Sequence, residues 1–304
     1  MATLIMINKR AGERPPWLKI RLPGDIEKLP VTALVRDLGL NTVCQEARCP
    51  NIYECWNAGT ATFMILGDTC TRRCTFCAVG KGEPLPPDPL EPEKVAEAVA
   101  KMGVKHCVIT TVNRDDLADG GAAHFARTIE QVRARSGASI EVLISDLGGN
   151  REALRTILAA RPEVLAHNVE TVPGLYLQVR PGSKYARSLD VLGWANEDGH
   201  DGMYTKSSLM LGLGETDEEI FRVASDLRAR GVDIFTIGQY LAPSERNHPV
   251  RKYYTPQEFD ALGRRTKDLG FHHVESGPLV RSSYMAHRAV ESTAGTGHAE
   301  DHVR

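Results

Sequence analysis

Ala-Thr-Phe-Met-Ile-Leu, at residues 61–66, leads within four residues into Cys70-Thr-Arg-Arg-Cys74-Thr-Phe-Cys77. The first six residues form a short apolar run with β-branched and aromatic side chains, which predicts a buried strand. The cysteines that follow have the spacing C-x3-C-x2-C. Three thiolates in one short loop can ligate three irons of a [4Fe–4S] cube and leave the fourth iron open to a small molecule. The stretch therefore predicts a metal centre at the end of a parallel sheet.

A zinc site is the alternative for this loop, with a histidine or cysteine from elsewhere as the fourth ligand. Zinc sites favour paired C-x2-C knuckles, and these three cysteines have no matching second knuckle. Arg72 and Arg73 either moderate the negative charge of a cluster or face solvent.

A second group of cysteines lies upstream and has the spacing C-x4-C-x5-C: Cys44, Cys49 and Cys55. The first 60 or so residues show no clear hydrophobic period, and they hold Pro15, Pro16, Pro23, Pro30 and Pro50. Metal binding supplies folding free energy that such a segment lacks. We therefore expect a second cluster here, with buried or incidental thiols as the alternative. Cys107 lies in an apolar run and is expected in the core.

Short apolar runs alternate with longer amphipathic ones from residue 61 onward. The runs predict strands over 61–66, 106–112, 140–146, 164–170, 207–213 and 234–241. The intervening patterns predict helices over 92–102, 122–134, 151–160, 189–197, 217–230 and 256–269. Six strand–helix units in about 210 residues are too few for a full eight-unit barrel. We expect an α/β fold with a partial (β/α)6 barrel. A doubly wound open sheet is the competitor.

The composition is that of an ordinary globular protein, since 42% of the 304 residues are hydrophobic and 25% are charged. A formal net charge of −2 gives no electrostatic case for a nucleic-acid or membrane partner. No stretch approaches the ~20 apolar residues of a membrane helix, and residues 1–21 lack the features of a secretory signal. We expect a cytoplasmic, reducing compartment, in which the seven cysteines are better explained as metal ligands or catalysts than as disulfides.

The cluster loop resembles that of the radical S-adenosylmethionine superfamily, and Phe76 matches the aromatic residue common there. Longer stretches are similar to the lipoyl synthase family and span nearly the whole chain. They include Pro50-Asn51-Ile52, Glu54-Cys55-Trp56, Arg114-Asp115-Asp116-Leu117, Asp119-Gly120-Gly121, Ala166-His167-Asn168-Val169-Glu170-Thr171-Val172-Pro173, Leu211-Gly212-Leu213-Gly214-Glu215-Thr216 and Gly277-Pro278-Leu279-Val280-Arg281-Ser282-Ser283-Tyr284.

The resemblance implies an enzyme that inserts two sulfur atoms, at carbons 6 and 8, into an octanoyl chain bound to a lysine of a carrier protein. It implies S-adenosylmethionine and two [4Fe–4S] clusters. One cluster starts the radical chemistry, and an auxiliary cluster is sacrificed as the sulfur donor. The implied partners are an octanoylated lipoyl carrier domain or the H protein of glycine cleavage, an electron donor such as flavodoxin or ferredoxin, and cluster-assembly proteins.

By the same resemblance, Cys70, Cys74 and Cys77 hold the radical cluster. The auxiliary cluster falls to Cys44, Cys49 and Cys55, with Ser283 as the fourth ligand and Ser282 as the fallback. The implied segments are an N-terminal extension with the auxiliary cysteines over 1–60, the barrel over 61–270, and a C-terminal extension over 271–304 with Arg281-Ser-Ser-Tyr284 and a polar tail.

Four further residues are candidates for contacts with S-adenosylmethionine, substrate or cluster. Asn168 and Glu170 alternate on one face of a predicted strand, near its C-terminal end. Orienting the loops at the barrel mouth is their alternative role. Lys206 and Arg281 are weaker candidates, because a solvated cation is the commoner finding.

Two other functions fit parts of the sequence. Another sulfur-inserting enzyme of the same superfamily, such as a biotin synthase or a tRNA methylthiotransferase, would share the cluster loop. The second of these needs RNA-binding modules, for which 69 residues before Cys70 and a neutral charge give no support. A non-catalytic cluster or zinc carrier would leave six barrel units unexplained.

Overall fold

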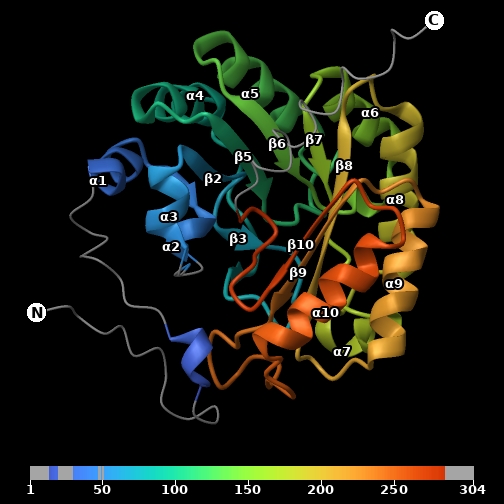
Figure 1. Ribbon diagram of the computed structural model, residues 1–304. Helices are drawn as coiled ribbons and strands as arrows, with labels where there is room; N and C mark the ends of the chain where they lie inside the picture. The colour runs from blue at the N-terminus through green and yellow to red at the C-terminus, as the bar shows by residue number, and fades with distance from the viewer. Residues whose placement is uncertain (1–13, 20–29, 47–48, 50, 285–304) are drawn as a thin grey trace, which may run out of the picture.

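The main sheet is singly wound and largely parallel. The computed structural model describes residues 14–19, 30–46, 49 and 51–284 (Figure 1). In this part of the chain the main sheet has eight strands in the order β1-β2-β5-β6-β7-β8-β9-β10. Their bounds are β1 (Asn41–Thr42), β2 (Thr60–Ile65), β5 (His106–Thr111), β6 (Ser139–Leu143), β7 (Val164–Ala166), β8 (Tyr204–Leu211), β9 (Ile234–Gln239) and β10 (His273–Gly277).

The strand order distinguishes the two predicted architectures. In a doubly wound sheet the chain returns to the middle and then adds strands on the other side. Here each parallel strand from β2 to β10 lies beside its predecessor in the chain. This winding curls the sheet in one direction, with helices outside, as in a barrel. The sheet stays open between β1 and β10, so the predicted partial barrel is confirmed.

Six helices follow the six predicted strands and cover the outer face of the sheet (Figure 1). They are α4 (Glu91–Met102), α5 (Ala122–Arg135), α6 (Arg151–Ala159), α8 (Tyr185–Asp198), α9 (Asp217–Ala229) and α10 (Pro256–Lys267). Helices α9 and α10 each begin with a reciprocal threonine–glutamate capping box, which satisfies free backbone N–H groups. No helix in the described residues is long and apolar enough to cross a membrane.

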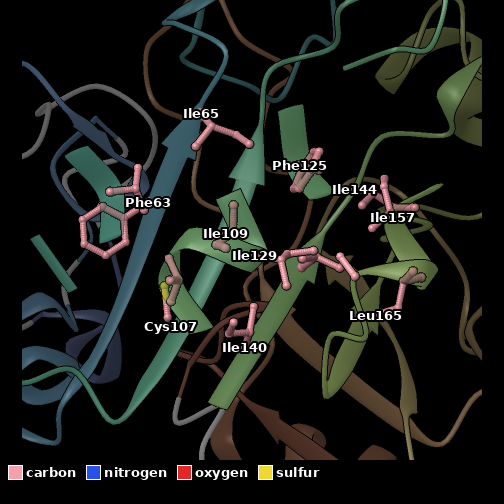
Figure 2. Packing of buried hydrophobic residues seen from close by; sticks show 14 of the residues in the cluster. Phe63, Ile65, Cys107, Ile109, Phe125, Ile129, Ile140, Ile144, Ile157 and Leu165 are labelled. Atoms are coloured by element: carbon pink, nitrogen blue, oxygen red, sulfur yellow. The ribbon is translucent and has the colours of Figure 1, made fainter. Parts of the chain in front are cut away.

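The main core lies between these helices and the outer face of the sheet. Phe63 and Ile65 on β2 pack there with Ile109 on β5 and Phe125 on α5 (Figure 2). Full burial of each such side chain contributes about 1.5–3 kcal/mol. Cys107 is fully buried in the same core, as predicted, and its burial raises the pKa of the thiol.

The N-terminal segment is more regular than the sequence indicated. It contains η1 (Pro16–Leu18), α1 (Pro30–Asp37), α2 (Val43–Glu46) and α3 (Ile52–Asn57). Elements of three to eight residues are too short to show a hydrophobic period. Strand β1 has two residues and extends the sheet by antiparallel pairing with β2.

The sheet also continues past residue 270, where we expected the barrel to end. Strand β10 pairs in parallel with β9 along its whole length. Its sequence, His-Val-Glu-Ser-Gly, has one aliphatic residue and so lacks the pattern of a buried strand. The polar tail expected from residue 286 lies outside the described residues.

A charged pair lies inside the barrel, near the start of its strands. The Lys206 ammonium lies 2.9 and 3.0 Å from the two Glu141 carboxylate oxygens, and both residues are 1% exposed. His106 Nε2 lies 3.4 Å from Glu141 and Nδ1 lies 2.7 Å from the Ser139 hydroxyl. Burial alone would raise the pKa of Glu141, but Lys206 and His106 lower it. Glu141 is therefore held as a carboxylate.

Removing one member of this pair leaves an uncompensated buried charge. We expect Lys206→Met to lower the free energy of unfolding by about 3–5 kcal/mol, and Lys206→Met/Glu141→Gln to recover most of the loss. Anaerobic denaturant titration of the purified variants measures both changes. A Lys206→Met protein with the wild-type midpoint would show that the pair is unimportant for stability.

Candidate active site

The loop with Cys70, Cys74 and Cys77 leaves the carboxyl end of β2 through a left-handed residue. Leu66 has φ +67°, and a left-handed backbone costs an ordinary residue about 1–2 kcal/mol. Its N–H donates to Glu91 Oε2 at 2.7 Å, and its carbonyl accepts from Arg114 at 3.1 Å. Gly121 has φ +90°, which favours glycine, and a Cβ there would lie 2.2 Å from Leu66 Cδ1, so a larger residue would displace the Leu66 side chain. Several independent contacts therefore fix the residue from which the loop starts.

Two distant segments hold the loop farther along. The Thr75 N–H donates to the Val179 carbonyl, at the end of α7 (Tyr176–Val179), at 2.9 Å. After β9, the His248 N–H donates to the Thr75 carbonyl at 3.0 Å, and the Asn247 side chain donates to the Cys77 carbonyl at 3.2 Å. The three cysteines are therefore positioned by backbone contacts on both sides. In the short second sheet, β3 (Thr69–Cys70) pairs with β4 (Gly80–Lys81) and closes the base of the loop.

The three thiols are electrostatic neighbours. Removal from water, together with the neighbouring Cys74 and Cys70 thiolates, raises the pKa of Cys77 to about 11. The pKa of Cys74 is raised mainly by the same desolvation. Cys70 Sγ accepts from the main-chain N–H groups of Asn113 at 3.3 Å and Arg72 at 3.4 Å. Three such thiolates are stable together only beside positive charge, which bound iron supplies.

Arg72 is an internal residue. From the sequence alone, it could either moderate the charge of a cluster or face solvent. It is 8% exposed and contacts Asp115 at 2.7 and 2.8 Å and Asp146 at 2.6 Å. Burial raises the pKa of Asp146, but the hydrogen bond and charge of the Arg72 guanidinium together lower it more strongly. The pKa of Asp146 therefore falls to about 2. This ion pair ties the loop to the segments that follow β5 and β6. Asp146, the last residue of a predicted barrel strand, was the available sequence signal for it.

Asn168 and Glu170 lie next to the cluster loop, although not on a regular strand. Strand β7 ends at Ala166, and Glu170 has φ +65°. The Asn168 amide donates to Glu170 Oε1 at 3.1 Å, and Asn168 Oδ1 is buried with no hydrogen-bond partner among the residues that the structure describes. Desolvation raises the pKa of Glu170, and its charge in turn raises the pKa of Cys74 and Cys77.

Arg180 connects these two parts of the site, and sequence reasoning missed it. The residue is 7% exposed, and its guanidinium donates to the carbonyls of Asn168 and Val169 at 2.8 and 3.2 Å. Its charge acts on both Cys74 and Glu170. Its Nε has no hydrogen-bond partner within the described residues. An arginine in the turn after a four-residue helix follows no pattern that marks it as internal.

The auxiliary cysteines lie in the N-terminal segment, whose helices α2 and α3 contact β2. The Cys49 N–H donates to the Cys44 carbonyl at 2.9 Å. Desolvation raises the pKa of both thiols, and proximity to Cys49 raises that of Cys44 further. Arg281 acts in the opposite direction on Cys49. Cys55 is buried in α3, which packs against β2.

The C-terminal segment after β10 contacts this N-terminal region (Figure 1). The Asn51 amide donates to the Leu279 carbonyl at 2.7 Å, and the Tyr284 hydroxyl lies 3.2 Å from both Glu54 oxygens. The Thr62 hydroxyl donates to Ser283 Oγ at 3.1 Å. Residues more than 220 positions apart in sequence therefore meet beside the auxiliary cysteines.

The remaining candidates lie in different places. Phe76 packs, partly buried, with Val179, Leu213 and Tyr240 beside the cluster loop. Lys206 is paired with Glu141 near the start of β8, so the structure gives it a partner at the opposite end of the strands from the loop.

The donor set fits two iron–sulfur clusters better than a single metal ion. Among the described residues, no three His, Cys, Asp or Glu side chains are arranged to hold one ion. Thiolates on different corners of a cubane lie farther apart than ligands of one ion. The six thiols in two groups suit two clusters. Asn168 Oδ1 and Arg180 Nε, which have no hydrogen-bond partner within the described residues, lie beside one of these groups and suit a polar ligand.

Known proteins of one family are similar to this chain. Residues 64–227 match the model of the radical SAM superfamily. The lipoyl synthase of Rubrobacter xylanophilus is 56% identical over 91% of this chain and 87% of its own length. That of Koribacter versatilis is 52% identical over 94% of both chains.

Solved structures show the same fold at low sequence identity. Methylornithine synthase has a TM-score of 0.55 at 13% identity, over 81% of this chain and 82% of its own. The FeFe-hydrogenase maturase HydG from Carboxydothermus hydrogenoformans also has a TM-score of 0.55 at 13% identity, over 88% of this chain and 75% of its own. On the relatives' identity and coverage, the chain belongs to the lipoyl synthase family of the radical S-adenosylmethionine superfamily.

Proposed function

We propose that Cys70, Cys74 and Cys77 hold the cluster at which this lipoyl synthase cleaves S-adenosylmethionine. The observation that carries the proposal is the meeting of the three thiols with Asn168 and Glu170 at the carboxyl ends of the strands. When bound, that cluster supplies one electron for cleavage of the sulfonium.

The protein groups around the loop have separate roles in this proposal. The Glu170 carboxylate and the free Asn168 oxygen accept hydrogen bonds from the amino or hydroxyl groups of S-adenosylmethionine. Arg180 keeps both in place through the Asn168 and Val169 carbonyls. Arg72 anchors the loop to Asp146, so that the thiolates keep their relative positions during electron transfer.

Cys44, Cys49 and Cys55, with Ser283, are proposed to hold the auxiliary cluster that supplies the sulfur. The contact of Ser283 with β2 beside Cys44 supports the serine as the fourth ligand. An oxygen ligand binds iron more weakly and exchangeably than a thiolate does, which suits a cluster that comes apart. Arg281, next to Cys49, offsets part of the negative charge there.

The family acts on lipoyl carrier substrates. For this chain we propose an octanoyl-lysine on a lipoyl carrier domain or on the H protein of glycine cleavage, with sulfur inserted at carbons 6 and 8. Flavodoxin or ferredoxin is the proposed electron donor, and cluster-assembly proteins are the proposed source of new auxiliary clusters.

Loss of one radical-cluster thiolate tests the first assignment. We expect Cys74→Ala to abolish formation of 5′-deoxyadenosine from S-adenosylmethionine under dithionite, because two thiolates retain the cluster poorly. Cys107→Ala removes a core thiol and is expected to keep cleavage. Chromatography of the nucleoside products measures both, and cleavage above background in Cys74→Ala would contradict the assignment.

Loss of the serine ligand tests the second assignment. We expect Ser283→Ala to retain the auxiliary cluster weakly and to lose sulfur insertion into an octanoyl-lysyl peptide, while S-adenosylmethionine cleavage is largely kept. Ser282→Ala is the matched control and is expected to insert sulfur normally. Mass spectrometry of the peptide checks both variants. Unchanged insertion in Ser283→Ala would reject this ligand, and a loss confined to Ser282→Ala would move the role to that residue.

A further inference from the structure

Thr62 occupies the inward face of β2, between the two cysteine groups. Its neighbours Ala61 and Phe63 belong to the outer core. Successive side chains on a strand point to opposite faces, so Thr62 points into the barrel. It is 3% exposed, and it lies eight residues before Cys70 on the strand that leads into the radical-cluster loop.

The same residue contacts two proposed ligands that come from opposite ends of the chain. Its hydroxyl donates to Ser283 Oγ at 3.1 Å. Thr42 on β1 pairs with Phe63, so the chain that continues into Cys44 passes beside Thr62. Burial raises the pKa of the Cys44 thiol, and the Thr62 main-chain N–H and the nearby hydroxyl oxygen act to lower it.

A threonine hydroxyl has one proton to donate. In the structure that proton goes to the serine oxygen, and the main-chain N–H remains available to the Cys44 sulfur. A donor to an anionic oxygen forms a stronger hydrogen bond than a donor to a neutral one. The hydroxyl is therefore suited to hold the Ser283 oxygen both before and after that oxygen binds iron.

We propose that Thr62 is a positioning residue of the auxiliary site, which holds Ser283 beside Cys44 and thereby sets how firmly the auxiliary iron is retained. This inference rests on the proposed role of Ser283 as a ligand. It adds a group that touches no iron itself and acts through the serine.

The test is the rate at which a ferrous chelator removes iron from the anaerobically reconstituted full-length protein. Ser283→Ala identifies the auxiliary phase as the one that it accelerates. We expect Thr62→Val to accelerate the same phase by about tenfold or more, the scale of one lost hydrogen bond to a charged group. Thr62→Ser keeps the hydroxyl and is expected to restore a rate close to wild type.

Two further variants separate positioning from a general loosening of the fold. Thr110→Val removes another buried strand hydroxyl, which donates to the Leu143 carbonyl at 2.9 Å, and is expected to leave the auxiliary phase unchanged. If Thr62 acts through the serine, Thr62→Val/Ser283→Ala releases iron no faster than Ser283→Ala alone.

The outcomes distinguish the two proposals. If Ser283→Ala accelerates release and Thr62→Val does not, the role of Thr62 is overturned and the serine ligand stands. If neither accelerates release, both assignments fall. An additive double variant, or equal acceleration by Thr110→Val, also overturns the inference, because Thr62 would then act by another route.

Discussion

The position of strand β2 is the constraint on which both candidate cluster sites depend. At its carboxyl end the chain turns left-handed at Leu66 and enters the loop with Cys70. Along the edge away from β5 it pairs with β1, which brings Cys44 alongside. Its inward face meets Ser283 through Thr62. One six-residue strand thus fixes how the two groups of thiols are placed relative to each other. On the proposed assignment, a radical formed at the Cys70 loop and a sulfur donor at the auxiliary cysteines serve the same substrate chain. We therefore infer that this spacing is a functional requirement.

Positive charge on buried or partly buried arginines accompanies both groups of cysteines. Arg180 acts on Cys74 and Glu170 at the radical site, and Arg281 acts on Cys49 at the auxiliary site. Arg72 is neutralised by Asp115 and Asp146, so it anchors the loop more than it adds charge. Desolvated thiolates repel one another, and these arginines lower that cost only in part. Iron supplies the rest, and we infer that binding of the clusters contributes to the stability of the N- and C-terminal segments.

The sequence predicted the barrel because most of its strands are short, largely apolar runs buried on both faces, and its helices carry clear periods. It predicted the cysteine groups because ligand spacing in a short loop is local information. It missed β1 and β10, since two residues or a single aliphatic side chain show no period. Arg180 and the Thr62–Ser283 contact were also beyond it, because both depend on how distant segments meet. Ser283 was identified only from the family resemblance. Lys206 was a candidate for substrate or cluster contacts, but in the structure it is paired with Glu141 inside the barrel.

The central claim is that two separate groups of cysteines hold two [4Fe–4S] clusters, one for each step of the reaction. Iron and sulfide content of the anaerobically reconstituted protein tests it most directly, beside variants with Cys70, Cys74 and Cys77, or Cys44, Cys49 and Cys55, replaced by alanine. The account predicts about eight irons in the wild-type protein and about four in each triple variant. About four irons in the wild-type protein, falling to none without Cys70, Cys74 and Cys77, would remove the sulfur donor and contradict the account.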